Sequence, residues 1–192
     1  MIRYVATLLF AFSAVALGAS GNISKVNSSI RVDGGGQAGD VSTVNGSITI
    51  GRNASVREVD TVNGSIRLDE RARAESVETV NGGVTLGEGV LVSEDVSAVN
   101  GKLTVRRGAR VGGRLENVNG DFLLEGATVG RGIETVNGDI VVGAGSRVDG
   151  GVTVEDSNSW KWRAKSRNPR LTIESGAVVA VGHTRANFYT TA

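Results

Sequence analysis

The sequence has no cysteine, one proline, one histidine and few aromatic residues, which make up 4% of its 192 residues. Without cysteine, the chain cannot form a disulfide framework, a thiolate metal site or a lipidated cysteine. A single proline beside 28 glycines excludes collagen-like and proline-rich disordered chains. With so few rings, a core must be built from Val, Ile, Leu and Ala. These absences favour a thin structure with a narrow aliphatic interior.

Side chains that commonly carry catalysis are equally scarce. The only histidine, His183, lies near the C-terminus in no recognisable motif. No Ser-His-Asp set, histidine cluster or Cys-His pair can be assembled around it. Polysaccharide lyases on β-helices need no histidine, but their coils are longer and carry large loops, whereas the coils here are short and uniform. We therefore expect no enzyme and no cofactor, and a carbohydrate-active enzyme is the least favoured alternative.

The tripeptide Val-Asn-Gly is the dominant feature of what is present. It occurs six times, and a degenerate copy, Val26-Asn27-Ser28, precedes the first. Successive asparagines are 18 or 19 residues apart. A fixed period of this length is typical of a solenoid whose coils stack on one another. The seven asparagines are Asn27, Asn45, Asn63, Asn81, Asn100, Asn119 and Asn137.

Within each coil, counted from Val41 in the first full repeat, apolar residues recur at positions 1, 4, 8, 10, 14 and 16. The pairs 8/10 and 14/16 have the period of two expected of strands with one buried face. Positions 8 and 10 are predicted to form core stacks, in which Phe122 is the one ring. The pattern predicts an all-β, single-domain parallel β-helix with triangular coils. At roughly 4.8 Å per coil, the asparagines span about 29 Å.

Identical asparagines in every coil predict a structural role. Asn-Gly suits a turn because both residues tolerate positive φ. Stacked asparagines can also pass amide hydrogen bonds from coil to coil, as in cross-β ladders. The alternative is that the asparagines bind a ligand, but a ligand site rarely repeats in every coil.

Charged residues are also predicted to stack. Expected pairs of opposite charge are Arg52 with Glu70, Glu88 with Arg107, and Arg57 with Glu75. Expected pairs of like charge are Glu116 with Glu134, and Asp121 with Asp139. Neighbouring carboxylates repel unless they are screened or bridged by a hard cation such as calcium. A solvated acidic face is the favoured interpretation, so no metal site is predicted.

Residues 1–19 have the pattern of a secretory signal peptide. Arg3 is followed by an uncharged, mostly apolar run from Val5 to Leu17 that ends in small residues. This run is shorter than the roughly 20 apolar residues of a membrane-spanning helix. We expect the mature chain to begin near Leu17 to Ser20, in the periplasm or at the cell surface. An uncleaved anchor or a buried first helix is the alternative.

Charge then separates two regions of the mature chain. Loss of Arg3 leaves 20 basic and 20 acidic residues, a balance that argues against a nucleic-acid partner. Residues 20–154 form the predicted repeat domain, and residues 155–192 form a loop and a capping coil. The loop holds both tryptophans and the only proline where an eighth motif is due. Its candidate partner-binding residues are Trp160, Lys161, Trp162, Arg163, Lys165, Arg167 and Arg170.

The two ends of the predicted solenoid suggest functions. The tryptophan loop could contact polysaccharide or an anionic membrane surface, or could simply cover the open last coil. The first coil begins at about Ile23 with no obvious cap. Because an unprotected strand edge is a template for another chain, head-to-tail stacking into a homo-oligomer or filament is expected.

Residues 136–152, Val-Asn-Gly-Asp-Ile-Val-Val-Gly-Ala-Gly-Ser-Arg-Val-Asp-Gly-Gly-Val, resemble bactofilins, the polymer-forming β-helical proteins of bacteria. They are also similar to exported adhesin-like repeat proteins. The resemblance covers about residues 23–154 and implies a right-handed β-helix and self-association without nucleotide. Most bactofilins are cytoplasmic and lack a tryptophan segment of this kind. The expected function is an exported structural protein of the bacterial envelope that self-associates through its ends, with an adhesin-like binder as the alternative.

Overall fold

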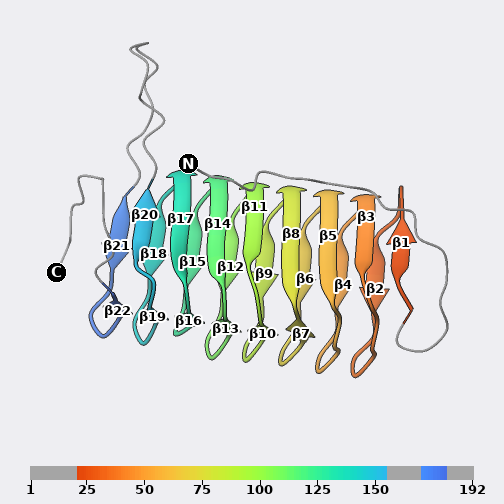
Figure 1. The fold of residues 1–192 in the computed structure, drawn as a ribbon, viewed down its shortest axis with the longest axis horizontal. Coiled ribbons are helices and arrows are strands. Elements are labelled where there is room, and N and C mark those ends of the chain that lie inside the picture. The colour runs from red at the N-terminus through yellow and green to blue at the C-terminus, as the bar shows by residue number, and fades with distance from the viewer. Residues whose placement is uncertain (1–20, 155–169, 181–192) are drawn as a thin grey trace, which may run out of the picture.

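The computed structural model describes residues 21–154 and 170–180, and these residues form a parallel β-solenoid (Figure 1). Their secondary structure consists of strands without helices, arranged in three parallel sheets along one long axis. Two sheets have eight strands and the third has six. The predicted all-β fold with three faces and coils of about 18 residues is therefore confirmed. The predicted signal peptide and the tryptophans lie outside the described residues.

Each sheet collects one strand from successive coils. The first sheet contains β1 (Ile23–Lys25), β3 (Val41–Asn45), β5 (Glu58–Asn63), β8 (Ser76–Asn81), β11 (Val96–Asn100), β14 (Arg114–Asn119), β17 (Gly132–Asn137) and β20 (Val152–Val154). The second contains β2 (Ile30–Val32), β4 (Ile48–Ile50), β6 (Ile66–Leu68), β9 (Val84–Leu86), β12 (Leu103–Val105), β15 (Phe122–Leu124), β18 (Ile140–Val142) and β21 (Leu171–Ile173). The third contains β7 (Arg73–Ala74), β10 (Leu91–Val92), β13 (Arg110–Val111), β16 (Thr128–Val129), β19 (Arg147–Val148) and β22 (Val178–Val179).

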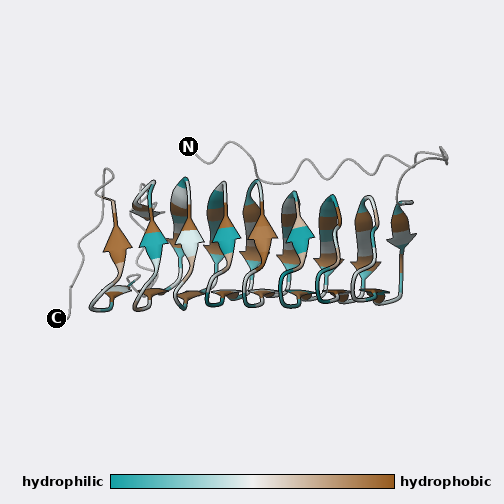
Figure 2. Ribbon diagram, turned by 90° about the horizontal axis from the view of Figure 1, so that it is seen from below, coloured by the Kyte–Doolittle hydropathy of each residue, from teal (hydrophilic) through white to brown (hydrophobic). Residues whose placement is uncertain are grey.

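The core is a set of aliphatic columns that run along the solenoid axis. Ile48 pairs with Ile66, and Ile66 pairs with Val84, and all three are at most 1% exposed. Phe122 occupies the same column and is equally buried. Hydrophobic and hydrophilic segments alternate along the coils in Figure 2, as expected for strands with one buried face. Each buried aliphatic side chain stabilises the fold by about 1.5–3 kcal/mol relative to its exposed state.

The valine of the repeated motif does not point into this core. Val44 and its equivalents are half-exposed, whereas the preceding Thr43 is buried. Thr43, Thr61 and Thr79 donate from Oγ1 to a backbone carbonyl of the preceding coil's corner, at 3.0 to 3.1 Å. A carbonyl at such a corner would otherwise lack a partner, and an unpaired buried polar group is costly. A polar column therefore lies inside the solenoid, which the apolar pattern alone did not predict.

The glycine of the motif serves close packing between corners. A Cβ at Gly64 would collide with the carbonyl oxygen of Gly46, and a Cβ at Gly82 with that of Gly64. Positive φ is present only in later copies, for example at Gly138 with a φ of 152°. The tolerance of Asn-Gly for positive φ is therefore not used in the earlier coils, where the close approach of the neighbouring backbone is the reason for glycine.

The last coil is interrupted at the asparagine corner and then completed in register. β20 ends at Val154, and β21 begins at Leu171, where Leu171 pairs with Ile140. β22 then pairs with β19, as each earlier strand of the third sheet pairs with its neighbour. Val154 and Arg170, the described residues on either side of this interruption, therefore flank the corner that carries the asparagines in other coils.

Candidate interaction surfaces

The seven asparagines form a continuous hydrogen-bonded ladder along one corner. Nδ2 of each asparagine donates to Oδ1 of the asparagine in the preceding coil, at 2.8 to 3.1 Å. All six bonds run in the same direction, so Asn27 contributes only its acceptor and Asn137 only its donor. The interior asparagines use one donor and one acceptor each within the ladder. The ladder therefore joins successive coils, although most of its side chains are exposed.

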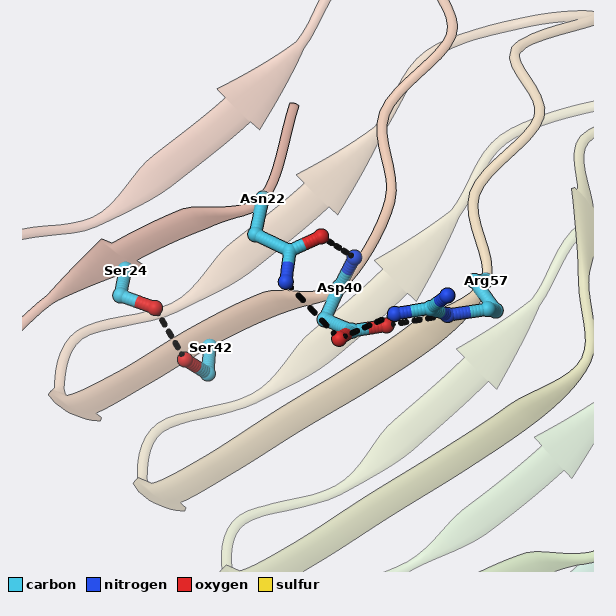
Figure 3. A network of polar contacts seen from close by, with 5 residues as sticks. All are labelled: Asn22, Ser24, Asp40, Ser42 and Arg57. Atoms are coloured by element: carbon cyan, nitrogen blue, oxygen red, sulfur yellow. Dashed lines mark hydrogen bonds and ion pairs between the residues drawn. The ribbon is translucent and has the colours of Figure 1, made fainter. Parts of the chain in front are cut away.

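A polar clamp ties the first coil to the second and third (Figure 3). Asn22 Nδ2 donates to Asp40 Oδ2 at 3.0 Å, and the Asp40 backbone N–H donates to Asn22 Oδ1 at 2.9 Å. Arg57 donates from Nε and Nη2 to the two carboxylate oxygens of Asp40, both at 2.6 Å. These hydrogen bonds raise the pKa of Arg57. Ser24 Oγ lies 2.8 Å from Ser42 Oγ on the same face.

We define the N-terminal end surface as the free edges of β1 and β2. Each is the terminal strand of its sheet, and no other described strand pairs with its far edge. The Ile30 N–H donates to Ser47 O, and Val32 O accepts from Gly51 N–H, so both residues face β4. Because backbone groups alternate in direction along a strand, the N–H and C=O of Arg31 face away from the solenoid.

Lys25 is the one charged residue at an inward register position of this edge. It pairs with Thr43, whose side chain is 3% exposed, and lies in the same column as Thr61 and Thr79. Lys25 itself is exposed because it belongs to the terminal strand. Inward-pointing charges on edge strands are a known means of discouraging edge-to-edge pairing.

We define the C-terminal end surface as the free edges of β20, β21 and β22. Each is the last strand of its sheet. Their residues are uncharged and mainly aliphatic, apart from Thr153 and Thr172. Val178 is 54% exposed, and Val26 in the first coil is 57% exposed; they are the two exposed large hydrophobic residues of the described chain. Exposed apolar groups thus occur in both terminal coils.

Carboxylates gather on the outer face of the first sheet. Partial burial raises the pKa of Asp60 to about 7, and the nearby charges of Glu78, Glu58 and Asp40 add to this shift. Burial also raises the pKa of Glu78. The predicted stack of Glu116 over Glu134 is present, and burial together with Glu134 raises the pKa of Glu116.

The two predicted like-charge stacks are held by donors within the chain. Arg114 lies between the first pair, 3.7 Å from Glu116 and 3.5 Å from Glu134. In the second, Asp121 Oδ1 accepts the backbone N–H of Asp139 at 2.9 Å. Within the described ranges, no group of three or more His, Cys, Asp or Glu residues could hold a metal ion.

The predicted pairs of opposite charge are realised only in part. Arg52 donates to Glu70 at 2.9 Å, as expected. Arg57 lies beside Glu75 as expected, since the Glu75 N–H donates to Arg57 O at 2.8 Å, but its guanidinium binds Asp40 in the preceding coil and not the Glu75 carboxylate. Both carboxylate oxygens of Asp40 lie within reach of the Arg57 guanidinium, which donates one hydrogen bond to each of them. Glu88 and Arg107, both within the described chain, form no ion pair; the neighbouring Arg106 binds Glu125 instead.

Of the candidate binding residues in the C-terminal segment, only Arg170 is described. Its backbone N–H donates to Asp139 Oδ1 at 3.0 Å, and its carbonyl accepts from Ile140 N–H at 2.7 Å. The other six lie outside the described residues, as does His183. Arg170 therefore marks the point where the chain rejoins the solenoid before β21.

These features define a parallel β-solenoid repeat protein with two uncapped sheet ends in the described chain. No helix in the part of the chain that the structure describes is long and apolar enough to cross a membrane. No protein-family model matches the sequence, and neither a curated protein nor a solved structure matches it. The surfaces described above are therefore the basis for a functional proposal.

Proposed function

We propose that this chain is an exported structural protein of the bacterial envelope, related in design to polymer-forming β-helices, and that it self-associates through its coil ends. The observation that carries the proposal is that, among the described residues, the terminal strands pair on one side only: β1 and β2 at one end and β20, β21 and β22 at the other. The pattern of residues 1–19 supports export. The uniform coils and scarce catalytic groups favour a scaffold over an enzyme.

The backbone supplies most of the proposed contact. Unpaired N–H and C=O groups at a sheet edge can bind a strand from another chain, which is how sheets extend between molecules. At Arg31, these groups face away from β4 and are available to a partner. Contacts of this kind need no catalytic or cofactor group, in keeping with the composition.

A proline at Arg31 tests this proposal directly. Arg31→Pro removes an outward N–H without removing a hydrogen bond to β4, because the flanking residues make those bonds. The matched control is Arg31→Ala, which removes the same side chain but keeps the N–H. We expect wild type and Arg31→Ala to form oligomers or filaments in sedimentation velocity and electron microscopy.

Arg31→Pro should remain a folded monomer, with wild-type circular dichroism. A wild-type protein that stays strictly monomeric at high concentration would overturn the proposal. The assays use the chain purified after export, with its N-terminus determined by mass spectrometry, so that the cleavage predicted near Leu17 to Ser20 is checked in the same preparation.

The segment between β20 and β21 supports a second candidate function, adhesion to polysaccharide or an anionic membrane surface. β21 pairs with β18 in register, so the solenoid tolerates the inserted residues at its asparagine corner. A basic, tryptophan-containing insertion can stack on sugar rings or bind anionic headgroups. Trp160→Ala with Trp162→Ala should abolish retention on envelope polysaccharide and anionic vesicles, and unchanged retention would assign the segment to capping.

A further inference from the structure

We infer that the partner of the N-terminal end surface is the C-terminal end surface of a second copy, stacked head to tail in the one-coil register, and that Lys25 limits this contact. The inference rests on the proposed self-association and specifies its orientation, register and limiting residue. It follows from the way in which each coil already contacts the next within one chain.

Every internal step of the solenoid is itself a head-to-tail contact. The face of one coil that points toward the C-terminus pairs with the opposite face of the next coil, always with parallel strands. In two of the three sheets, the end surfaces are therefore the two halves of the same kind of contact, with complementary backbone donors and acceptors; β22 of the third sheet has no counterpart strand in the first coil. Two N-terminal ends facing each other would instead bring together like charges from Lys25 and Arg31 of both copies.

Side chains at the two ends also match in this register. Head-to-tail stacking sets Ile23 beside Val152, Ile30 beside Leu171 and Val32 beside Ile173, each pair aliphatic as in the internal columns. On the outer face it sets Ser24 beside Thr153, which repeats the contact of Ser24 with Ser42 within the chain. There the two hydroxyl oxygens lie 2.8 Å apart (Figure 3).

Lys25 is the mismatch in this arrangement. In the proposed stack, Lys25 of one copy stands beside Val154 of the other copy. Val154 occupies the inward column and is 5% exposed. An ammonium at that place loses water without gaining a partner, which opposes association. The internal residues of the same column at Thr43, Thr61 and Thr79 carry no charge. Lys25 therefore makes the contact between molecules weaker than the contact between coils.

The orientation can be tested with engineered cysteines because the natural chain has none. Ser24→Cys and Thr153→Cys chains are mixed and treated with a short bifunctional thiol reagent. Head-to-tail stacking predicts linked pairs that contain one chain of each kind. A chain with both Ser24→Cys and Ser42→Cys is the positive control, because the reagent should link these two cysteines of neighbouring coils within one molecule. Linkage of Ser24→Cys or Thr153→Cys chains only to their own kind, in protein that does associate, would overturn the orientation and leave self-association standing.

The role of Lys25 is tested by Lys25→Thr, which installs the residue found in the same column of four internal coils. We expect the association constant from sedimentation to rise at least about tenfold, because an unpaired buried charge costs more than the 1.4 kcal/mol that a tenfold change represents. Lys25→Arg is the matched control and should give no gain. An equal gain in both variants would overturn the role of the charge. If no variant associates at all, both this inference and the proposed self-association fail.

Discussion

Arg57 and Asp40 join the second coil to the start of the third through two parallel hydrogen bonds, each 2.6 Å long. Asp40 also holds Asn22, the residue that precedes β1. One carboxylate therefore connects three consecutive coils at the N-terminal end, where the described strands stack on one side only. The first coil depends on this clamp more than any interior coil depends on a single ion pair, because interior coils pack against neighbours on both sides.

Arg57→Ala should loosen the first coil without unfolding the solenoid. The substitution leaves Asp40 with Asn22 alone and removes the bidentate contact to the third coil. Hydrogen exchange measured by mass spectrometry should become faster in β1, while β11 at the centre keeps its protection. Arg52→Ala is the control, since it removes one ordinary surface ion pair, to Glu70. Equal effects of the two variants on exchange in β1 would show that the clamp stabilises the first coil no more than an ordinary surface ion pair does.

Removing an asparagine from the middle of the ladder should destabilise the fold more than removing one from its end. Asn81→Ala deletes two ladder bonds, whereas Asn27→Ala deletes one. At about 0.5–1.5 kcal/mol for each hydrogen bond, the expected losses are about 1–3 and about 0.5–1.5 kcal/mol. Urea denaturation measures both free energies of unfolding. A larger loss of unfolding free energy for Asn27→Ala than for Asn81→Ala would contradict the view that the asparagines act only by joining coils.

Two buried threonines should respond in opposite ways to replacement by valine. Thr79 Oγ1 donates to Gly64 O at 3.1 Å, whereas Thr135 Oγ1 is buried without a protein partner in the described chain. Thr79→Val leaves a corner carbonyl unpaired and should cost about 1–3 kcal/mol of unfolding free energy. Thr135→Val removes an unsatisfied hydroxyl and should be neutral or stabilising. The same urea titration compares the two, and a similar loss in both would imply that Thr135 has a partner in solution.

The stability of the protein should depend on the charge of Asp60. Its pKa is about 7 in the folded chain against an ordinary value of 3.8, so the folded state holds this proton more tightly than the unfolded state does. The contribution of Asp60 to stability is therefore complete below pH 3.8, falls as pH rises, and levels off above about pH 7.

Asp60→Asn removes this contribution to the pH dependence. The variant should match wild type near pH 3.5 and melt at a higher temperature than wild type at pH 8, as measured by circular dichroism. Ser97→Asn, on the same outer column, is the control and should follow the wild-type pH profile. A melting difference that does not change between pH 4 and pH 8 would contradict the raised pKa of Asp60.

The sequence predicted the fold through its period, but some interior positions were assigned only by the structure. Apolar residues at positions 8 and 10 of each coil correctly marked the core, since alternation along a strand fixes which side chains share a face. Val44 looked equivalent to them, yet it is half-exposed, and the polar Thr43 takes the buried place. Hydropathy alone cannot show that a corner carbonyl of the neighbouring coil needs a hydroxyl donor.

It was harder to predict which ion pairs the charged side chains form than to predict which residues stack in one column. Glu116 and Glu134 stack as their spacing indicates. Arg57, however, reaches back to Asp40 and not forward to Glu75. A long side chain can turn toward either neighbouring coil, and the choice depends on the local corner geometry that places both oxygens of Asp40 within reach.

By itself, the sequence determined the repeating architecture, because a period of 18 or 19 residues with alternating apolar side chains has few other ways to bury its core. Only the tertiary structure decided how the ends differ. Lys25 is an ordinary surface lysine in the sequence, and its meaning comes from the register that sets it above Thr43. The stacking of coils turns positions far apart in the chain into one column, and the first member of that column alone carries a charge.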